Sequence, residues 1–197
     1  MVKRVFDLII SLLLIILLSP ILLILAVWIK SDSRGNIIYR QKRVGLHGKD
    51  FEILKFRTMH PEADKKGLLT VGGRDPRVTR SGYYLRKFKL DELPQLFNVL
   101  SGEMSLVGPR PEVRKYVDLY SEEQKKVLGV KPGITDYASI YYRKENELLA
   151  HAENPEQVYI SEIMPHKLQL NQQYISNAGL FTDIKILWQT FSRVFFG

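Results

Sequence analysis

The sequence predicts a helix-rich α+β fold, in which one small domain at residues 31–197 is seated on an N-terminal membrane helix at residues 1–30. Two observations carry this prediction. The first thirty residues hold an almost unbroken apolar run, whereas the rest of the chain places a pair of short strand patterns before several helical ones. A chain of 197 residues is long enough for one compact domain and a membrane element.

The membrane segment, Leu8 to Ile29, is almost entirely apolar and is long enough to cross a bilayer as a helix. Ser19-Pro20 lies near its middle. Proline removes a backbone donor and clashes with the carbonyl four residues earlier, so it predicts a kink. The Ser19 hydroxyl can donate to a carbonyl that the kink frees, which keeps a broken helix satisfied inside lipid.

Basic residues flank this segment on both sides, with Lys3 and Arg4 before it and Lys30 and Arg34 after it. The positive-inside rule therefore gives no clear direction. Asp7 adds a charge at the start of the run, where we expect it to pair with Arg4 or to stay at the headgroup level. Two interpretations remain open on these residues: a single span, and a re-entrant helix-break-helix with both ends on the cytoplasmic side.

The rest of the chain opens with two short strand patterns, at residues 36–41 and 51–57, which show partial alternation of apolar and polar side chains. The glycine-containing segment 45–50 supplies turn chemistry between them, so we expect a β-hairpin. Residues 60–79 are polar and contain several glycines and prolines, which predicts a loop.

Helical patterns follow the loop. Residues 83–100 form a helical region that is broken near Leu90, and Pro94 must lie in a first turn, where its missing N–H costs little. Ser101-Gly102 ends this region. Further helical patterns cover residues 112–128, with a capping box at Ser121 and Gln124, residues 154–174, interrupted at Pro165, and the C-terminal segment.

The C-terminal helix is amphipathic. Its apolar face consists of Leu180, Ile184, Leu187, Trp188, Phe191 and Phe195. This face either packs into the core or lies in the membrane interface, where Trp188 with Lys185 or Arg193 suits the boundary between lipid and water. Amphipathic interfacial helices are therefore part of the predicted fold class.

The composition limits the classes of partner. Lys and Arg number 29 against 21 Asp and Glu, a formal charge of +8. Such an excess indicates an acidic partner: nucleic acid, anionic lipid or a phosphorylated substrate. No cysteine is present, so the chain forms no disulfide. The sequence contains no P-loop and no Gly-x-Gly-x-x-Gly, and its four histidines lack metal-ligand spacing.

Asp91 and Glu92 form the densest candidate site, because they stand at the start of a predicted helix amid Arg86, Lys87 and Lys89. The helix N-terminus and the nearby cations both favour ionised carboxylates. An ionised carboxylate can attack phosphorus, and it is also a hard oxygen ligand for Mg²⁺. Acidic residues are common at helix starts, so a purely structural role stays open.

Two further segments suit a phosphate. Prolines on both sides fix the backbone around Arg110, and a rigidly held guanidinium suits bidentate phosphate binding. Lys55 and Arg57 lie on one face at the end of the second strand, because side chains alternate along a strand. Each segment alone also fits a solvated surface.

Taken together and in this order, the segments resemble the bacterial sugar transferases, the monotopic polyprenyl-phosphate phosphoglycosyl transferases. The matching motifs are Arg4 with Asp7, Ser19-Pro20, Gln41-x-Arg43-x-Gly45, KFRTM at 55–59, LDELPQLFNV at 90–99, SLVGPRP at 105–111 and KPGIT at 131–135. The resemblance covers essentially the whole chain, and its central motifs at this spacing are specific.

The resemblance implies a reaction. Asp91 is the expected nucleophile: it attacks the β-phosphate of a UDP-sugar, releases UMP and holds the sugar phosphate covalently until polyprenyl (undecaprenyl) phosphate takes it. The reaction is the first membrane step of glycoconjugate and polysaccharide assembly, at the cytoplasmic face of the bacterial inner membrane. Residues 1–30 are then a re-entrant helix broken at Ser19-Pro20, with Arg4 at the headgroup boundary.

The resemblance also assigns the site residues, with Mg²⁺ as the cofactor and no nucleic-acid partner. Asp91 and Glu92 are catalytic and hold the metal; Lys55, Arg57, Arg86, Pro109, Arg110, Pro111 and Arg143 bind substrate or phosphate; Arg4, Ser19 and Pro20 form the re-entrant element. The sugar, the pathway, the polyprenol, the oligomeric state and the duty of Glu92 are left open.

One region departs from the family pattern. After residues 131–135, many members continue with Gly and a run of small residues that ends in Asn-Gly-Arg, whereas residues 136–145 here read DYASIYYRKE. We expect this segment to face the sugar, with Arg143 in place of the usual arginine.

Two other functions remain as rivals. A membrane-anchored basic domain that binds nucleic acid or anionic lipid predicts cations spread over a surface and no dependence on Asp91. A lipid-phosphate hydrolase with the same nucleophile requires a group that activates water, and no histidine is suitably placed in the sequence.

Overall fold

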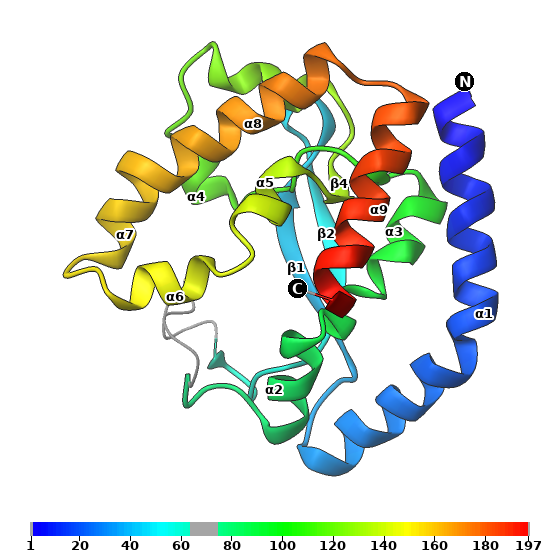
Figure 1. The fold of residues 1–197 in the computed structure, drawn as a ribbon. Helices are drawn as coiled ribbons and strands as arrows, with labels where there is room; N and C mark the ends of the chain where they lie inside the picture. The colour runs from blue at the N-terminus through cyan, green and yellow to red at the C-terminus, as the bar shows by residue number, and fades with distance from the viewer. Residues whose placement is uncertain (1, 64–74, 197) are drawn as a thin grey trace.

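The structure is a computed structural model that describes residues 2–63 and 75–196, with side chains up to Arg193 (Figure 1). It has the helix-rich α+β architecture that the sequence predicts. In chain order the regular elements are α1 (Val2–Asp32), β1 (Ile38–Val44), β2 (Asp50–Phe56), α2 (Arg80–Lys87), α3 (Gln95–Ser101), β3 (Ser105–Val107), α4 (Arg114–Val117), β4 (Gly133–Thr135), α5 (Tyr137–Tyr141), α6 (Glu145–Ala150), α7 (Pro155–Val158), α8 (Met164–Ser176) and α9 (Leu180–Phe196). Short helical turns are η1 (Leu46–Gly48), η3 (Leu90–Glu92), η4 (Gln124–Gly129) and η5 (Tyr159–Ile163). The predicted loop at 60–79 falls largely on residues 64–74, which lie outside the described residues.

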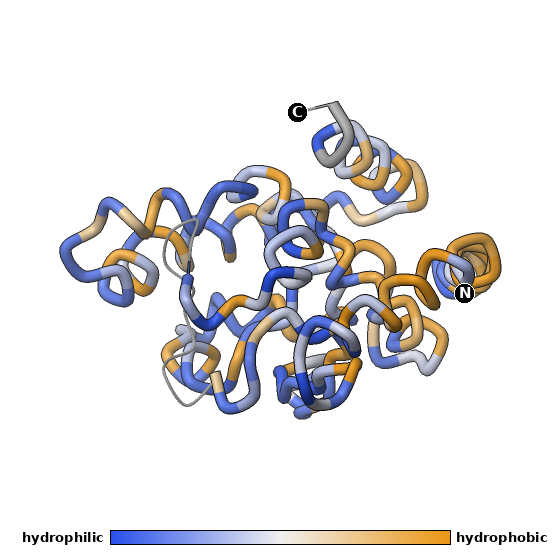
Figure 2. The backbone as a smooth tube through the Cα atoms, turned by 90° about the horizontal axis from the view of Figure 1, so that it is seen from below, coloured by the Kyte–Doolittle hydropathy of each residue, from blue (hydrophilic) through white to orange (hydrophobic). Residues whose placement is uncertain are grey.

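Helix α1 contains Pro20 and changes direction near its middle (Figure 1). The Ser19 hydroxyl donates to the Ile16 carbonyl at 2.8 Å, which is the carbonyl that Pro20 deprives of its usual partner. The predicted kink and its serine partner are therefore confirmed. Most apolar side chains of α1 are exposed, and Figure 2 shows the helix as a hydrophobic coil along one side of the molecule. Among the described residues, α1 is the one helix that is long and apolar enough to cross a membrane.

The N-terminal half of α1 is fastened to the rest of the fold by polar side chains. Arg4 donates to the carbonyls of Val99 and Leu100 at 2.6 and 3.1 Å, and so caps the C-terminal end of α3. Asp7 is buried and accepts from the Ser105 hydroxyl at 2.8 Å and from the Leu106 amide at 3.2 Å. The expectation that Asp7 pairs with Arg4 or stays at the headgroups is wrong. The Ser105 hydroxyl and the Leu106 amide of β3 bind the Asp7 carboxylate instead.

The other end of α1 is fastened in the same way. The Arg57 guanidinium donates to the backbone carbonyls of Ile29, Ser33 and Asn36 at 3.4, 2.9 and 2.6 Å. Asp32 accepts from the amide and the hydroxyl of Ser81 at 2.9 and 2.8 Å, at the start of α2. Arg57 thus binds the end of α1 and the segment that follows it, and Asp32 binds the first turn of α2.

The predicted hairpin is confirmed. Strands β1 and β2 are antiparallel, with Ile38 opposite Phe56 and Val44 opposite Asp50, so the first strand ends three residues later than expected. Three apolar clusters surround the hairpin: Val44 belongs to one, Ile53 to another and Phe56 to the third. The hairpin therefore connects the α1 side of the domain with the α7–α8 side.

The helical region after the loop breaks where the sequence indicates. Lys89 has a left-handed conformation (φ 57°), which ends α2 and starts η3. Pro94 has helical torsions and directly precedes α3, as predicted for a first turn. Gly102 closes α3 with a φ of 92°, a conformation that favours glycine.

Two short strands, β3 and β4, form a parallel pair that the sequence analysis missed. Ser105 lies opposite Gly133 and Val107 opposite Thr135. A Cβ on Gly133 would lie 2.1 Å from the Gly108 amide nitrogen, so no larger residue fits this close approach. The pair fixes the chain that leads directly to Arg110.

Two helix predictions need correction. Residues 112–128 form two short pieces, α4 and η4, although the capping box is present: the Ser121 amide donates to Gln124 Oε1 at 2.8 Å, and the Gln124 amide donates to Ser121 Oγ at 3.3 Å. Residues 155–176 are continuous through Pro165 because the π turn η5 precedes it and accommodates the missing N–H.

Helix α9 presents its predicted apolar face mainly to the outside. Leu187 is partly buried, whereas Leu180, Ile184, Trp188 and Phe191 are exposed. The core-packing interpretation is therefore wrong for most of this face, and the side chain of Phe195 lies outside the description. The helix packs instead through Asp183 and Ile186, both buried, and through Thr190, whose hydroxyl lies 2.7 Å from that of Thr135.

Candidate active site

The acidic pair lies on the η3 turn, between α2 and α3 and against β2. The left-handed backbone conformation of Lys89 turns the chain so that the Asp91 side chain points inward, and Asp91 is only 7% exposed. Asp91 Oδ1 is fully buried and has no hydrogen-bond partner among the described residues. A buried carboxylate oxygen without a partner is uncommon and indicates a functional position.

Glu92 and Arg110 form a two-pronged ion pair. Arg110 Nη1 donates to Glu92 Oε2 at 2.9 Å, and Nη2 donates to Oε1. Lys55 Nζ lies 3.8 Å from Glu92 Oε1. The Arg110 backbone amide donates to Asp136 Oδ2 at 3.1 Å, so both the main chain and the side chain of this arginine are held. Glu92 therefore orients Arg110, with Lys55 beside it.

The two carboxyl groups differ in their electrostatics. Burial raises the pKa of Asp91, and the neighbouring Glu92 charge raises it further; Lys55, Lys89 and Arg86 oppose the shift without reversing it. The cations therefore favour the charged form of Asp91, but burial and the charge of Glu92 outweigh them in its pKa. Burial also opposes ionisation of Glu92, but Arg110 and Lys55 together outweigh it and hold the pKa of Glu92 below its usual range.

The cations at the site are themselves buried. Burial lowers the pKa of Lys55 to about 8, although the charge of Glu92 opposes this. Burial likewise lowers the pKa of Arg86, and the charge of Asp91 is the largest opposing influence. Lys55 and Arg110 thus lie beside Glu92, and the charge of Arg86 acts on Asp91.

Among the described residues, neither Arg57 nor Arg143 forms a hydrogen bond or ion pair with Asp91 or Glu92. Arg57 directly follows β2, and its side chain binds the end of α1 and the segment after it. Arg143 lies in the turn between α5 and α6, where it forms no hydrogen bond or ion pair with a described residue. Pro109 and Pro111 frame Arg110, and their carbonyls accept from the Gly133 amide at 3.0 Å and from Arg43 Nη1 at 3.3 Å.

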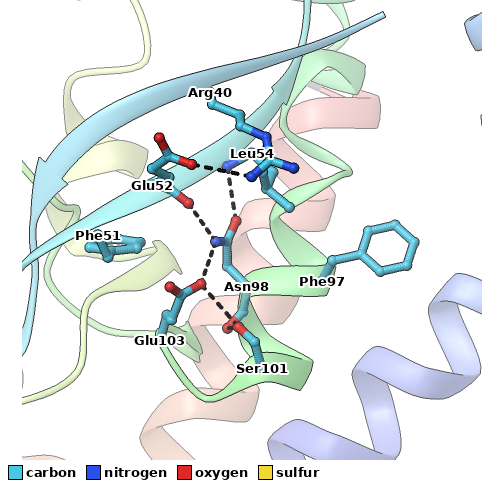
Figure 3. A pocket seen from close by; sticks show the side chains of 8 residues that line it. All are labelled: Arg40, Phe51, Glu52, Leu54, Phe97, Asn98, Ser101 and Glu103. Atoms are coloured by element: carbon cyan, nitrogen blue, oxygen red, sulfur yellow. Dashed lines mark hydrogen bonds and ion pairs between the residues drawn. The ribbon is translucent and has the colours of Figure 1, made fainter.

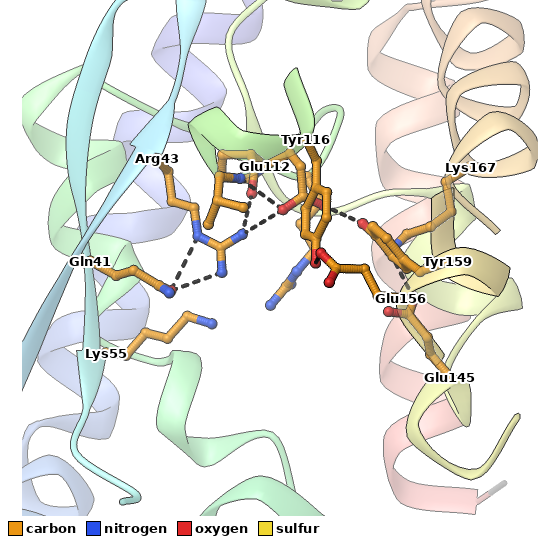
Figure 4. Close-up of polar contacts among 12 residues, drawn as sticks. Gln41, Arg43, Lys55, Glu112, Tyr116, Glu145, Glu156, Tyr159 and Lys167 are labelled. Carbon is orange, nitrogen blue, oxygen red and sulfur yellow. Dashed lines mark hydrogen bonds and ion pairs between the residues drawn. The ribbon is translucent and has the colours of Figure 1, made fainter. Parts of the chain in front are cut away.

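A network of hydrogen bonds around Arg43 and Glu112 borders the site, and the sequence indicates no role for it (Figure 4). Arg43 Nη1 donates to Glu112 Oε1 at 3.1 Å, and the Tyr159 hydroxyl donates to Glu112 Oε2. Gln41 Oε1 accepts from Arg43 Nε and Nη2 at 3.1 and 2.8 Å. The Gln41-x-Arg43-x-Gly45 motif was the available signal for the arginine, whereas the π turn that carries Tyr159 has no sequence signature.

Asp91 and Glu92 are the residues expected to bind Mg²⁺. Among the described residues no cluster of three or more His, Asp or Glu side chains is placed to hold a metal. Mg²⁺ commonly uses one or two carboxylates together with phosphate oxygens of the substrate. Asp91 fits this donor set because no described residue donates a hydrogen bond to its carboxylate, whereas both oxygens of Glu92 accept from Arg110.

A separate hollow lies elsewhere on the surface. It has a volume of about 480 Å³ and lies between the hairpin and α3 (Figure 3). Its polar side chains bind one another: Asn98 Nδ2 donates to Glu103 Oε2 at 2.9 Å, and Arg40 lies 3.2 Å from Glu52. None of the cations around Asp91 lines it, so this hollow is not the site that the acidic pair forms.

The chain is similar to known proteins over its whole length. The family model described as bacterial sugar transferase matches residues 1–197. The protein named uncharacterized sugar transferase EpsL of Bacillus subtilis (strain 168) is 40% identical over 192 residues, which cover 98% of this chain and 86% of that protein.

Two longer relatives carry more specific names. The undecaprenyl-phosphate glucose phosphotransferase of Komagataeibacter xylinus is 38% identical, and the match covers 98% of this chain and 36% of that protein. The UDP-glucose:undecaprenyl-phosphate glucose-1-phosphate transferase of Escherichia coli (strain K12) is 36% identical, with 99% and 40% covered. The chain therefore spans less than half the length of these two proteins.

Proposed function

This chain belongs to the bacterial sugar transferase family, and we propose that it transfers a sugar 1-phosphate from a UDP-sugar to polyprenyl phosphate, with UMP as the second product. One observation carries the proposal. A buried carboxylate, Asp91, keeps an oxygen without a partner while Lys55, Arg86 and Arg110 surround it. That arrangement suits a nucleophile toward a diphosphate, because phosphoryl transfer depends mainly on positioning and on neutralising charge.

In the first step, a carboxylate oxygen of Asp91 attacks the β-phosphorus of the UDP-sugar. The bond from this phosphorus to the bridging oxygen breaks, and UMP leaves with the electron pair. The sugar 1-phosphate is then joined to Asp91 as an acyl phosphate. Arg110, which Glu92 holds in place, and the neighbouring Lys55 bind the phosphate oxygens on which charge develops.

In the second step, a phosphate oxygen of the lipid attacks the same phosphorus, and the bond to Asp91 breaks. Both nucleophiles are anionic oxygens, so neither step requires a general base to remove a proton. His166, whose Nδ1 lies 2.7 Å from the Tyr142 hydroxyl, is not needed for the chemistry. The sugar keeps its anomeric configuration because no bond to carbon is broken.

Mg²⁺ is part of the proposal. When bound, the ion would neutralise charge on the diphosphate, and Asp91 is the protein ligand that the geometry favours. Glu92 serves better as the partner that fixes Arg110 than as a metal ligand, because both of its oxygens are engaged.

We further propose that α1 re-enters the bilayer and returns to the cytoplasmic face of the inner membrane. Its bend at Ser19-Pro20, its exposed apolar surface and the polar contacts of both its ends with one domain support this topology. A test uses single cysteines at Val2 and Ser31, since the natural chain has none. Labelling of both positions from the cytoplasmic side supports re-entry, and labelling from opposite sides contradicts it.

The reaction itself is tested with purified protein, Mg²⁺, undecaprenyl phosphate and a panel of UDP-sugars. We expect UMP release with at least one sugar. Without the lipid, labelled UDP-sugar should leave a phosphosugar on the peptide that contains Asp91, and Asp91→Asn should abolish it. An adduct on another residue, or full turnover by Asp91→Asn, would contradict the assignment of the nucleophile.

The rival basic-domain function has less support. A surface for nucleic acid or anionic lipid presents its cations to solvent, whereas Lys55 and Arg110 are largely buried against Glu92. The same UMP assay separates the two functions, because the rival predicts no release.

A further inference from the structure

Gln95 is a buried amide without partners. Its residue is 0% exposed, and neither Nε2 nor Oε1 has a hydrogen-bond partner among the described residues. Burying an amide in this way is unfavourable, because both its donor and its acceptor lose their bonds to water. A fully buried amide without hydrogen bonds lowers the stability of the fold. Residues that lower stability in this way are typical of functional sites.

A nearby buried amide, that of Asn98, shows that hydrogen-bond partners for an amide are available in this part of α3. Asn98 lies one turn later on α3 and is also buried. Its Oδ1 accepts from the Leu54 amide at 2.9 Å, and its Nδ2 donates to the Glu52 carbonyl and to Glu103 at 2.8 and 2.9 Å. Asn98 thus has a structural role in joining α3 to β2, and Gln95 has no comparable bonds.

The chain path relates Gln95 to the nucleophile. The turn η3 continues into α3 through Leu93 and Pro94, both with helical torsions. Asp91 and Gln95 are therefore four residues apart on one helical run, a spacing at which Gln and Asp side chains can interact. A long side chain on a helix leans toward the preceding turn, which here is the turn of Asp91. Besides the two amide atoms of Gln95, Asp91 Oδ1 is the buried side-chain atom of this run that has no hydrogen-bond partner among the described residues.

We propose that Gln95 is a positioning residue for Asp91, and that its Nε2–H donates to Oδ1 when the other carboxyl oxygen carries the phosphosugar. In the acyl phosphate, Oδ1 is the carbonyl oxygen. A hydrogen bond to it withdraws electron density, which makes the carboxylate a better leaving group when the lipid phosphate attacks. The bond thus favours the second step more than the first. This inference rests on the covalent route proposed above.

The test replaces Gln95 with Met, which keeps length and volume but has neither donor nor acceptor. We expect kcat for UMP release with the lipid present to fall roughly 10- to 100-fold, the range seen when a hydrogen bond that orients a site residue is removed. KM for the UDP-sugar should change little. The phosphosugar adduct should build up to a higher steady-state level than in the natural protein, because its breakdown is slowed.

Stability distinguishes this role from a structural one. Removing an unsatisfied buried amide should leave the melting temperature of Gln95→Met unchanged or raise it. The matched control, Asn98→Leu, should lower the melting temperature, because three bonded groups lose their partner. Its kcat per folded molecule should remain near that of the natural protein.

Two results would overturn the inference: an unchanged kcat in Gln95→Met, or a melting temperature that falls as far as in Asn98→Leu. Gln95→Leu serves as a second variant with the same expectations. If the natural protein itself releases no UMP with any sugar of the panel, the proposed reaction fails; if it does and Gln95→Met behaves like it, only the role of Gln95 fails.

Discussion

Arg110 shows how single residues define the site. Two of its N–H groups bind Glu92, a third contact reaches the Ile134 carbonyl at 3.3 Å, and its backbone amide is held by Asp136. A guanidinium that is fixed in this manner presents its remaining donors in one direction. The paired prolines in the sequence indicate its rigidity, but nothing in the sequence indicates that Glu92 is its partner.

Replacing Arg110 with Lys should separate charge from geometry. Lysine keeps the positive charge but cannot form the two-pronged contact with Glu92. A hydrogen bond to a charged group contributes about 1.5–3 kcal/mol, so we expect kcat/KM for UMP release to fall by roughly 10- to 100-fold. Steady-state kinetics with the UDP-sugar measure this. A variant that retains full kcat/KM would show that the fork is unnecessary.

Lys55 gives the site a pH dependence. Burial lowers its pKa to about 8, so the side chain loses its charge as the pH rises through that value. We expect kcat/KM to fall above about pH 8, because neutral Lys55 no longer attracts phosphate. Lys55→Arg, which stays charged, should remain active to higher pH, and the ratio of the two pH profiles is the measurement.

The free energy of unfolding should rise with pH, whereas kcat/KM falls. The unfolded chain keeps a lysine pKa near 10.5, so between about pH 8 and 10.5 it holds more protons than the folded protein. The free energy of unfolding therefore receives a contribution from Lys55 that rises with pH across this window. Urea unfolding at several pH values, compared with Lys55→Met, isolates that contribution; a contribution that falls with pH would contradict the buried position of this lysine.

At the scale of elements, strand β2 separates two cations that look alike in the sequence. Lys55 points to the acidic pair, whereas Arg57 binds the carbonyl of Ile29 near the end of α1 and those of Ser33 and Asn36, which follow α1. Arg57→Met should lower the free energy of unfolding by about 2 kcal/mol or more, because three backbone carbonyls lose a charged donor. Lys55→Met should lower activity instead. Denaturant unfolding and UMP release on both variants check this contrast, which an equal loss of stability would contradict.

Helix α1 depends on Pro20 for its bend. Pro20→Leu restores the missing amide donor, so the helix should straighten and the protein should shift toward a span with its two ends on opposite sides. Cysteine labelling at Val2 and Ser31 in this variant measures the shift. Ser19→Ala is a milder control, because the bend should survive the loss of the hydroxyl that serves Ile16.

The same elements show which features a sequence can reveal. The hairpin, the break near Leu90 and the kink at Pro20 follow from local chemistry, and the structure has all three. The parallel pair β3–β4 could not be predicted, because each strand has three residues and the pairing joins distant segments. For the same reason, the sequence does not predict the contacts of Arg57 and Asp7 with distant backbone groups: Arg57 was expected to bind phosphate, and Asp7 to pair with Arg4 or stay at the headgroup level.

At the scale of the whole molecule, apolar side chains remain exposed on two helices. On α1 most of the surface is apolar, and on α9 Phe181 and Trp188 are 82% and 67% exposed. Lys3 of α1 binds Asp183 of α9 at 2.5 Å, and Figure 1 shows the two helices on the same side. This arrangement supports the interpretation that α9 lies in the membrane interface beside α1.

Charged residues on α9 should therefore weaken membrane binding. We expect the double variant Phe181→Glu and Trp188→Glu to release more protein from anionic vesicles in a flotation assay, with an unchanged melting temperature in detergent, since both side chains are exposed. Leu119→Glu is the matched control, because this exposed leucine closely follows α4, and Figure 1 shows α4 away from α1. An equal effect of the control would contradict the role of α9.

The attachment of α1 at both ends has a consequence for making a water-soluble form of the enzyme. Deleting residues 1–32 would remove the caps of α3 and α2 and the partner of Asp183 together with the lipid-facing surface. Truncation should therefore yield an unfolded or aggregating protein rather than a free catalytic domain. A soluble form should instead keep Lys3, Arg4, Asp7 and Asp32 and exchange only the outward leucines and isoleucines of α1 for polar residues.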